Sequence, residues 1–307
     1  IDFFPENVSI MYTKYRRRTM SELKLRAMAK INLGLDVTGV REDGYHEVKM
    51  IMQSIYLYDR IFLKITKKPE IAVSTNLSYL PANENNLAYK AAKLLIDEFE
   101  IRSGVKIEIQ KYIPVAAGMA GGSTDAAAVL FGMNKLLKLG LSKEELMARG
   151  VKLGADVPYC IMRGTALAEG IGEELTALPA MPPCTILIAK PPVAVSTKFV
   201  YDNLILDERT VHPEIDGLIG DLKKRDLAAL AGHMGNLLET VTIKEYPVID
   251  TIKQTMRKNG ALGAMMSGSG PTVFGIFSDK DAAEAAEREI RSKQLAKQTY
   301  ITRPYNL

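Results

Sequence analysis

The segment at residues 114 to 127, PVAAGMAGGSTDAA, holds the residues best suited to bind an anion. Gly118, Gly121 and Gly122 lie close together there, after a strand-like run and before a helical stripe of apolar residues. Glycines let the backbone approach negative oxygens closely, and the first N–H groups of a helix point outward at the positive end of its dipole. The pattern therefore predicts a loop that binds phosphate groups at a helix N terminus.

The hydroxyl residues that follow these glycines have two possible roles. Ser123 or Thr124 is expected to cap the helix, or to bind a phosphate-associated Mg²⁺. The loop matches neither of two common nucleotide motifs, because no lysine follows at the Walker A spacing and GxGxxG is absent both here and at Gly268. From the loop alone, a flexible turn with a serine cap remains the other interpretation.

A lysine in an apolar strand is the second chemical feature. Lys30 lies between Ala29 and Ile31 in the run AKINL, where an unpaired ammonium would be costly to bury. The sequence therefore predicts a charged partner for Lys30. Asn32 follows two positions later and is expected on the same face of the strand.

Composition narrows the class of protein. The 307 residues are 47% hydrophobic and 25% charged, and no apolar run approaches the roughly 18 residues of a membrane span. The net charge is +4, half of it in residues 1 to 19, so the nearly neutral remainder argues against a nucleic-acid-binding protein. Cys160 and Cys184 lack CxxC spacing, which makes a zinc site or disulfide framework improbable and favours the cytoplasm.

Periodicity predicts the elements that position these residues. Residues 1 to 19 are interpreted as an extension, disordered or vector-derived. Strands are expected at 23–32, 48–55, 60–66 and 105–111, with an amphipathic helix over 86–100. After a proline-rich boundary at 177–183, we expect a strand at 185–191, two helices, two strands within 261–277, a helix over 279–291 and a strand near Thr299.

Six motifs occur in one order along the chain: AKINLGL, DGYHEV, PVAAGMAGGSTDAA, LGADVPYCI, GTALAEGIGE and MSGSGPTVFGIF. Together they resemble the GHMP kinase superfamily, and within it the branch whose substrate is a methylerythritol carrying a cytidine diphosphate group. The resemblance implies an α+β, two-lobed fold, with an ATP-binding lobe at 20–180 and a ferredoxin-like, split β-α-β substrate lobe at 181–307. It also implies that ATP and Mg²⁺ phosphorylate the 2-hydroxyl of that substrate, in the non-mevalonate isoprenoid route, by a monomer or weak homodimer.

The resemblance carries residue roles with it. Asp156 of LGADVP matches the catalytic base and Lys30 its charge partner. Tyr45 and His46 of DGYHEV match a cytidine-binding pair, and Thr197 with Tyr201 completes that pocket, although Phe199 is an equal candidate for its second ring. Asn32 matches a position near the transferred phosphate or substrate. The positions matched to ATP binding are Asn86, Lys111, Pro114, Val115, Ala116, Ala117, Gly118, Met119, Ala120, Gly121, Gly122, Ser123 and Thr124.

The loop departs from the pattern of the superfamily. Ala116, Ala117, Met119 and Ala120 stand where related loops have more glycine and serine. Alanine tolerates a positive φ poorly, so ordinary backbone angles are expected at these positions. Two other functions stay open: a kinase for a different alcohol, such as homoserine or mevalonate, and a sensor that binds ligands without turnover.

Overall fold

The structure is a computed structural model that describes residues 21–307, so the extension expected over residues 1 to 19 lies outside the described part. In the first lobe the strands are β1 (Glu22–Val40), β2 (His46–Thr66), β3 (Ile71–Thr75), β4 (Gly104–Gln110), β5 (Thr165–Glu169) and β6 (Glu174–Ala177). The helices of this lobe are α1 (Leu87–Glu98), α2 (Gly121–Leu137), α3 (Lys143–Val151) and α4 (Asp156–Met162).

The second lobe begins at β7. Its strands are β7 (Thr185–Lys190), β8 (Gly263–Met266), β9 (Val273–Phe277) and β10 (Gln298–Thr302). Its helices are α5 (Thr197–Asp202), α6 (Ile215–Lys224), α7 (Leu227–His233), α8 (Glu239–Glu245), α9 (Val248–Lys258) and α10 (Lys280–Ser292).

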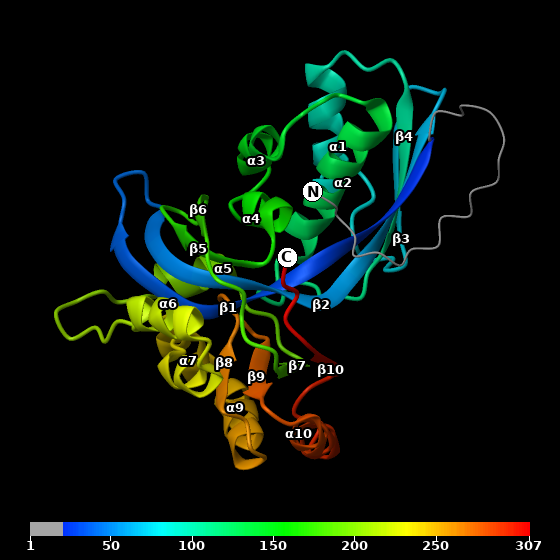
Figure 1. The fold of residues 1–307 in the computed structure, drawn as a ribbon. Coiled ribbons are helices and arrows are strands. Elements are labelled where there is room, and N and C mark those ends of the chain that lie inside the picture. Colours follow the sequence, from blue (N-terminus) through cyan, green and yellow to red (C-terminus); the bar gives the residue numbers. More distant parts are fainter. Residues whose placement is uncertain (1–20) are drawn as a thin grey trace.

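The two lobes are built on two sheets. In the first, β3-β4-β2-β5-β6 run side by side and β1 pairs with β2, with β3 and β4 the only parallel neighbours among the described strands. The second has the order β10-β7-β9-β8 with every pair antiparallel, which is the strand order of a ferredoxin-like split β-α-β lobe. The α+β, two-lobed fold is confirmed. Helices α1 to α4 lie on one side of β1 and β2, and the second sheet lies on the other (Figure 1).

Two expectations about the elements are wrong. The runs at 48–55 and 60–66 belong to one continuous strand, β2, because Asp59 between them is fully buried and stays in the ladder opposite Ala27. Five helices, α5 to α9, occupy the described stretch between β7 and β8, where two were expected. Most of these are short, and a short helix shows too few turns for its periodicity to be counted.

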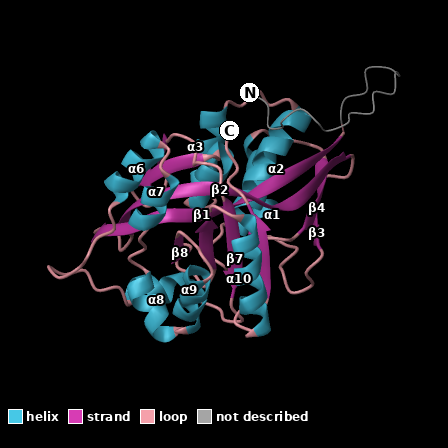
Figure 2. Ribbon diagram, turned by 60° about the horizontal axis from the view of Figure 1, so that its bottom comes forward, coloured by secondary structure: helices cyan, strands magenta, loops and turns pink. Residues whose placement is uncertain are grey.

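A shared apolar core joins the lobes. Alternate residues of β1, at Ala29, Ile31 and Leu33, are fully buried in a cluster that includes Ile188 and Phe274 of the second sheet. The intervening residues of the strand point the other way, so the alternation turns Lys30 toward the first lobe's helices. In Figure 2 the helices α2 and α3 lie toward the top of the view and α8 and α9 at the bottom, with β1 and β2 between them.

The ladder between β1 and β2 is irregular beside Lys30. The register shifts between Met28 and Lys30, and there the Lys30 N–H donates to the carbonyl of Met119 in the glycine-rich loop at 3.3 Å. Across the same irregularity Tyr56 and Tyr305 donate backbone hydrogen bonds that tie residues 303–305 to β2. A break in the ladder thus brings the loop and the C-terminal segment against the strands that carry Lys30.

None of the helices in the described residues 21–307 is both long and apolar enough to cross a membrane.

Candidate active site

A single cavity of about 1040 Å³ lies between the glycine-rich loop, the β1–β2 hairpin and α5. Its wall includes both residues predicted to be catalytic, the loop from Pro114 to Ser123, and Asn86 and Lys111. Tyr45, His46, Thr197 and Tyr201 also line it. Of the described residues predicted for the site, Thr124 and Asn32 do not line it, since both side chains are buried beneath the wall.

The loop has an unusual backbone. Ala116, Gly118 and Ala120 have φ values of 50°, 71° and 55°, while the residues between them keep negative φ. Such alternation turns successive N–H groups toward one concave side, which is a general way of binding an anion. The expectation of ordinary angles is therefore wrong at Ala116 and Ala120, because the local conformation of the loop overrides the preference of alanine.

Helix α2 begins at Gly121, and its N-terminal N–H groups face the loop. Its N-cap is Ala120, which offers no side-chain acceptor, so the expectation that Ser123 or Thr124 caps the helix is wrong. The first N–H groups of any helix have no acceptor within it. Those of Gly121, Gly122 and Ser123 are on the cavity wall, where an anion can accept from them.

The strained alanines lead to a stability prediction. An alanine in the left-handed region costs roughly 1–2 kcal/mol, while glycine costs about 0.5–1 kcal/mol of extra chain entropy. Ala120→Gly should therefore raise the free energy of unfolding by up to about 1 kcal/mol, as measured by urea denaturation. Ala117→Gly is the matched control, because Ala117 has no positive φ and glycine should destabilise the protein there. Equal destabilisation by both variants would contradict the strain.

The predicted partner of Lys30 is present. The Lys30 Nζ atom lies 3.9 Å from Asp156 Oδ2 and donates to Asn32 Oδ1 at 2.8 Å. The Lys30 side chain is 6% exposed, whereas that of Asp156 is 32% exposed and reaches the cavity. The buried Lys30 ammonium thus lies next to the accessible Asp156 carboxylate, and its hydrogen bond to Asn32 fixes its position.

Helix α4 places the carboxylate. Asp156 is the first residue of α4, and Tyr159, one turn later, is buried with its hydroxyl 3.0 Å from Ser54 Oγ. The same hydroxyl donates to the carbonyl of Gly164 at 2.8 Å. These bonds fix the helix against β2, and burial raises the pKa of Tyr159 well above its usual value, so the phenol remains a neutral donor.

The other end of the cavity is aromatic. The rings of His46, at the start of β2, and Tyr201, in α5, have centroids 4.8 Å apart and are tilted by 45°. Burial raises the pKa of Tyr201 to about 12, with Asp156 adding to the shift. Tyr45 is 61% exposed at the mouth, and Thr197 contacts Ser269 of the SGSGP segment at 2.8 Å. The structure brings Tyr201 to the wall; Phe199, on the same helix, is 40% exposed and is not among the described residues that line it.

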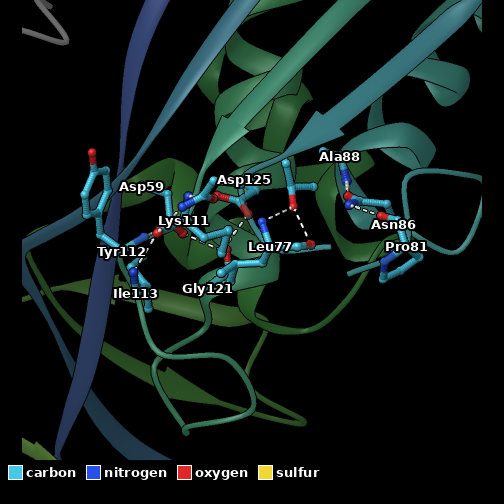
Figure 3. Close-up of polar contacts among 12 residues, drawn as sticks. Asp59, Leu77, Pro81, Asn86, Ala88, Lys111, Tyr112, Ile113, Gly121 and Asp125 are labelled. Carbon is cyan, nitrogen blue, oxygen red and sulfur yellow. Dashed lines mark hydrogen bonds and ion pairs between the residues drawn. The ribbon is translucent and has the colours of Figure 1, made fainter. Parts of the chain in front are cut away.

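Asn86 and Lys111 both line the cavity and lie apart from each other, Lys111 beside Asp59 and Asp125 and Asn86 beside Ala88 and Pro81 (Figure 3). Asn86 caps α1: its Oδ1 accepts from the Ala88 N–H at 2.9 Å and its Nδ2 donates to the carbonyl of Pro81 at 2.8 Å. Lys111 is buried against two carboxylates, those of Asp59 and Asp125. Burial lowers the pKa of Lys111, but attraction to Asp125 and Asp59 outweighs it and the net shift is upward.

Asp59, Asp125 and Ser269 are site residues that sequence reasoning missed. Asp125 lies on the cavity wall, and within the described chain its Oδ1 atom is buried without a hydrogen-bond partner. Burial raises the pKa of Asp125 well above its usual range, and attraction to Lys111 offsets only part of the shift. Asp125 stood in the loop motif, and an aspartate in the first turns of a helix after glycines was a signal available from the sequence.

The SGSGP segment supports the loop from the second lobe. Ser267 Oγ donates to the carbonyl of Gly118 at 2.9 Å, and a Cβ added at Gly118 would lie 2.1 Å from the Ser267 carbonyl oxygen. Only glycine fits position 118, where both the positive φ and the close backbone require it. A segment of the second lobe therefore packs directly against the phosphate loop of the first.

The described residues offer little to a metal ion by themselves. Within 21–307 there is no group of three or more His, Cys, Asp or Glu residues placed to hold one. Ser123, on the cavity wall, and Thr124, which is buried, were the two hydroxyls predicted for Mg²⁺. Mg²⁺ is commonly held by substrate phosphates and only one or two protein ligands, so this arrangement fits a metal that arrives with a nucleotide.

Comparisons with known proteins match this architecture. The family models for the GHMP kinase N-terminal domain and the GHMP kinase C-terminal region match residues 86–164 and 218–297. A 4-diphosphocytidyl-2-C-methyl-D-erythritol kinase from Lachnospira eligens is 56% identical over 286 residues, covering 93% of this chain and 99% of the relative. The enzyme of the same name from Lachnoclostridium phytofermentans is 57% identical over 92% of this chain and 98% of the relative.

Solved structures agree. A crystal structure of 4-(cytidine 5'-diphospho)-2C-methyl-D-erythritol kinase is 30% identical, with a TM-score of 0.77, over 93% of this chain and all of the other. A homoserine kinase from Cytophaga hutchinsonii has a TM-score of 0.75 at 19% identity over 96% of this chain and 98% of the other, a likeness of fold alone. The chain is thus a small-molecule kinase of the GHMP type, and it belongs to the 4-diphosphocytidyl-2-C-methyl-D-erythritol kinase family.

Proposed function

We propose that this kinase transfers the γ-phosphoryl group of ATP to the 2-hydroxyl of 4-diphosphocytidyl-2-C-methyl-D-erythritol. The observation that carries the proposal is the composition of one cavity wall: the phosphate loop, the Lys30–Asp156 pair, and the rings of His46 and Tyr201. The substrate is the one named for the relatives. The cavity wall has groups suited to the phosphates, to the acceptor hydroxyl and to the cytidine base.

The phosphates of ATP bind the loop. Loop N–H groups, the N terminus of α2 and its dipole all favour negative oxygens there. The nucleoside lies toward Asn86, beyond the loop and away from the substrate end. Binding a triphosphate mainly through backbone groups leaves Lys30 and Asp156 for the chemistry.

The cytidine group binds the aromatic end. His46 offers ring nitrogens that can donate to or accept from the base edge, and Tyr201 offers a ring face for stacking. Thr197, on the same helix as Tyr201, presents a hydroxyl to the substrate. Because His46 belongs to the first lobe and Tyr201 to the second, the base is held between the lobes.

The acceptor hydroxyl lies at Asp156. Its carboxylate accepts the hydroxyl proton as the new O–P bond forms and the bond between the γ-phosphorus and the β,γ-bridging oxygen breaks, releasing ADP. The proton then passes from Asp156 to water. The Lys30 ammonium, 3.9 Å away, stabilises the negative charge that develops on the transferred group.

Mg²⁺ fits this site as a companion of ATP. When bound, it would supply positive charge that neutralises the phosphate groups in the transition state. The Ser123 hydroxyl, at the N terminus of α2, is the side chain on the cavity wall that would hold it. The remaining positions would be filled by phosphate oxygens and water.

Release of ADP tests the function directly. With ATP and Mg²⁺ present, a coupled assay should detect ADP with the cytidyl methylerythritol substrate and not with homoserine, with mevalonate or with no substrate. A preference for another alcohol would retain the kinase and reject the base pocket. No turnover with any of them would favour a protein that binds ligands as a sensor.

A further inference from the structure

Lys111 connects the two ends of the phosphate loop (Figure 3). Its Nζ atom pairs with Asp59 Oδ2, which comes from β2, and donates to Asp125 Oδ2 in α2 at 2.7 Å. It also donates to the carbonyl of Gly121, the first residue of α2, at 3.2 Å. The Lys111 side chain is 5% exposed and those of Asp59 and Asp125 are 0% and 5% exposed.

These three contacts use all the hydrogen-bond donors of the Lys111 ammonium. A lysine has three N–H donors and no acceptor. Its acceptors here are one oxygen each of Asp59, Asp125 and Gly121. No donor of Lys111 is left for a nucleotide, although the residue lines the cavity and its motif position is matched to ATP binding.

Asp59 holds the entry to the loop as well. Its Oδ1 atom accepts from the N–H of Tyr112 at 2.6 Å and from the N–H of Ile113 at 2.9 Å. These are the residues immediately before Pro114, where the loop starts. Asp59 therefore fixes the chain before the loop through its Oδ1 atom. Its Oδ2 atom binds Lys111, which in turn fixes the chain after the loop at Gly121.

The first residue of α2 is shaped for this arrangement. A Cβ added at Gly121 would lie 3.2 Å from Lys111 Nζ and 3.2 Å from Ile113 Cγ2. Such contacts are tight, so any larger residue at position 121 would push the ammonium away from its partners. Gly121 is not one of the described glycines with a positive φ, so its backbone angles do not require glycine. The close approach of Lys111 is therefore the structural reason for glycine at this position.

We propose that Asp59, Lys111 and Asp125 form a loop clasp, a set of positioning residues that holds the phosphate loop ready for ATP without contacting the nucleotide. The inference rests on the proposed function, because it assigns a role within the same site. The loop it holds has three residues of positive φ, two of them alanines, and so is not a conformation that the free chain would favour. Binding is tighter when such a segment is already ordered, because its ordering cost is not met at binding.

The test compares variants that break the clasp with a variant that removes Lys253, a buried lysine that does not line the cavity. Lys111→Met and Asp59→Asn should each raise the dissociation constant of Mg·ATP, measured by calorimetry, by at least about tenfold, because each breaks a buried charged pair. The double variant should bind Mg·ATP no more weakly than whichever single variant binds it less tightly, because both substitutions break the same Asp59–Lys111 pair. Affinity for the cytidyl substrate should stay unchanged, which a general loss of folding would not produce.

Lys253→Met is the matched control. Lys253 pairs with Glu239 at 2.6 Å and is 10% exposed at its side chain, so it also loses a largely buried ion pair, but in the second lobe and off the cavity wall. It should leave the Mg·ATP dissociation constant unchanged. If Lys253→Met weakens Mg·ATP binding as much as Lys111→Met, loss of any buried pair suffices and the clasp is rejected.

Hydrogen exchange tests the clasp without any nucleotide. In the free protein, amides of residues 115–123 should exchange faster in Lys111→Met and Asp59→Asn than in the parent or in Lys253→Met. If Lys111→Met fails to fold, Gly121→Ala, whose Cβ would press on the Lys111 ammonium and on Ile113, should show the same faster exchange. If Lys111→Met weakens Mg·ATP binding while Asp59→Asn changes neither binding nor exchange, Lys111 contacts the nucleotide and the proposal falls. Neither measurement needs turnover, so failure of the proposed reaction would be seen separately.

Discussion

Replacing Asp156 by asparagine should lower turnover at least about 100-fold, the scale expected when a general base is removed. The amide keeps the shape of the side chain and its place at the start of α4, but it cannot accept the hydroxyl proton. Its loss also leaves the buried Lys30 ammonium without its carboxylate partner. The affinity for Mg·ATP should remain close to that of the parent, because the phosphate site that we propose is the loop rather than Asp156. Steady-state kcat and a calorimetric ATP titration measure the two effects.

Asp281→Asn is the appropriate control for that experiment. Asp281 is also an aspartate in the first turn of a helix, α10, but it is exposed and belongs to the second lobe. Its substitution should leave both quantities unchanged. Near-normal turnover in Asp156→Asn would remove Asp156 from the role of base and leave Lys30 as the only charged group of the pair beside the acceptor.

Truncating Tyr201 to alanine should weaken substrate binding more than it slows the reaction. Stacking of a base on an aromatic ring contributes about 1–3 kcal/mol, which corresponds to roughly a 5- to 150-fold rise in KM for the cytidyl substrate. Stacking is made equally in the ground state and the transition state, so kcat should change little. The KM for ATP should be unaffected, because Tyr201 lies at the end of the cavity that carries His46.

Phe199→Ala separates the two aromatic candidates of α5. Phe199 lies two residues before Tyr201 on the same helix, but it is partly exposed and off the cavity wall among the residues described. Its removal should leave KM for the cytidyl substrate unchanged. A rise in KM with Phe199→Ala and none with Tyr201→Ala would place the base on the other ring and require α5 to turn when substrate binds.

Local pattern was sufficient for much of the fold. The alternation of AKINL predicts a strand with Lys30 facing away from its apolar neighbours, and the stripe at 86–100 predicts α1, because both patterns depend on residues close in sequence. The join of two predicted runs into β2 depends instead on Asp59 being satisfied by lysine and backbone partners far along the chain. From the sequence alone, a charged residue such as Asp59 inside an apolar run predicts the end of a strand, because its distant hydrogen-bond partners are not known.

The site shows the same division. Burial of Lys30 implied a charged partner from physical chemistry alone, yet the identity of that partner came from the resemblance of the LGADVP motif. The clasp was only partly visible in the sequence: Asp125 stands in the loop motif and Lys111 matched a position for ATP binding, but Asp59 stands in no quoted motif. The positive φ values of Ala116 and Ala120 also run against residue preference, because the loop is held by contacts from the second lobe and from the clasp.

The pairing of residues 303–305 with β2 bears on how the polypeptide matures during synthesis. Gln53 donates to the carbonyl of Tyr305, 252 positions later, and the Tyr305 N–H donates to the carbonyl of Ser54, beside the strand that carries Lys30. The first lobe has therefore left the ribosome long before β2 obtains these partners, and contacts of such sequence separation form slowly. A nascent chain that stalls in the second lobe lacks these contacts beside the strand that carries Lys30. Completion of the first lobe is thereby coupled to translation of the segment that follows β10.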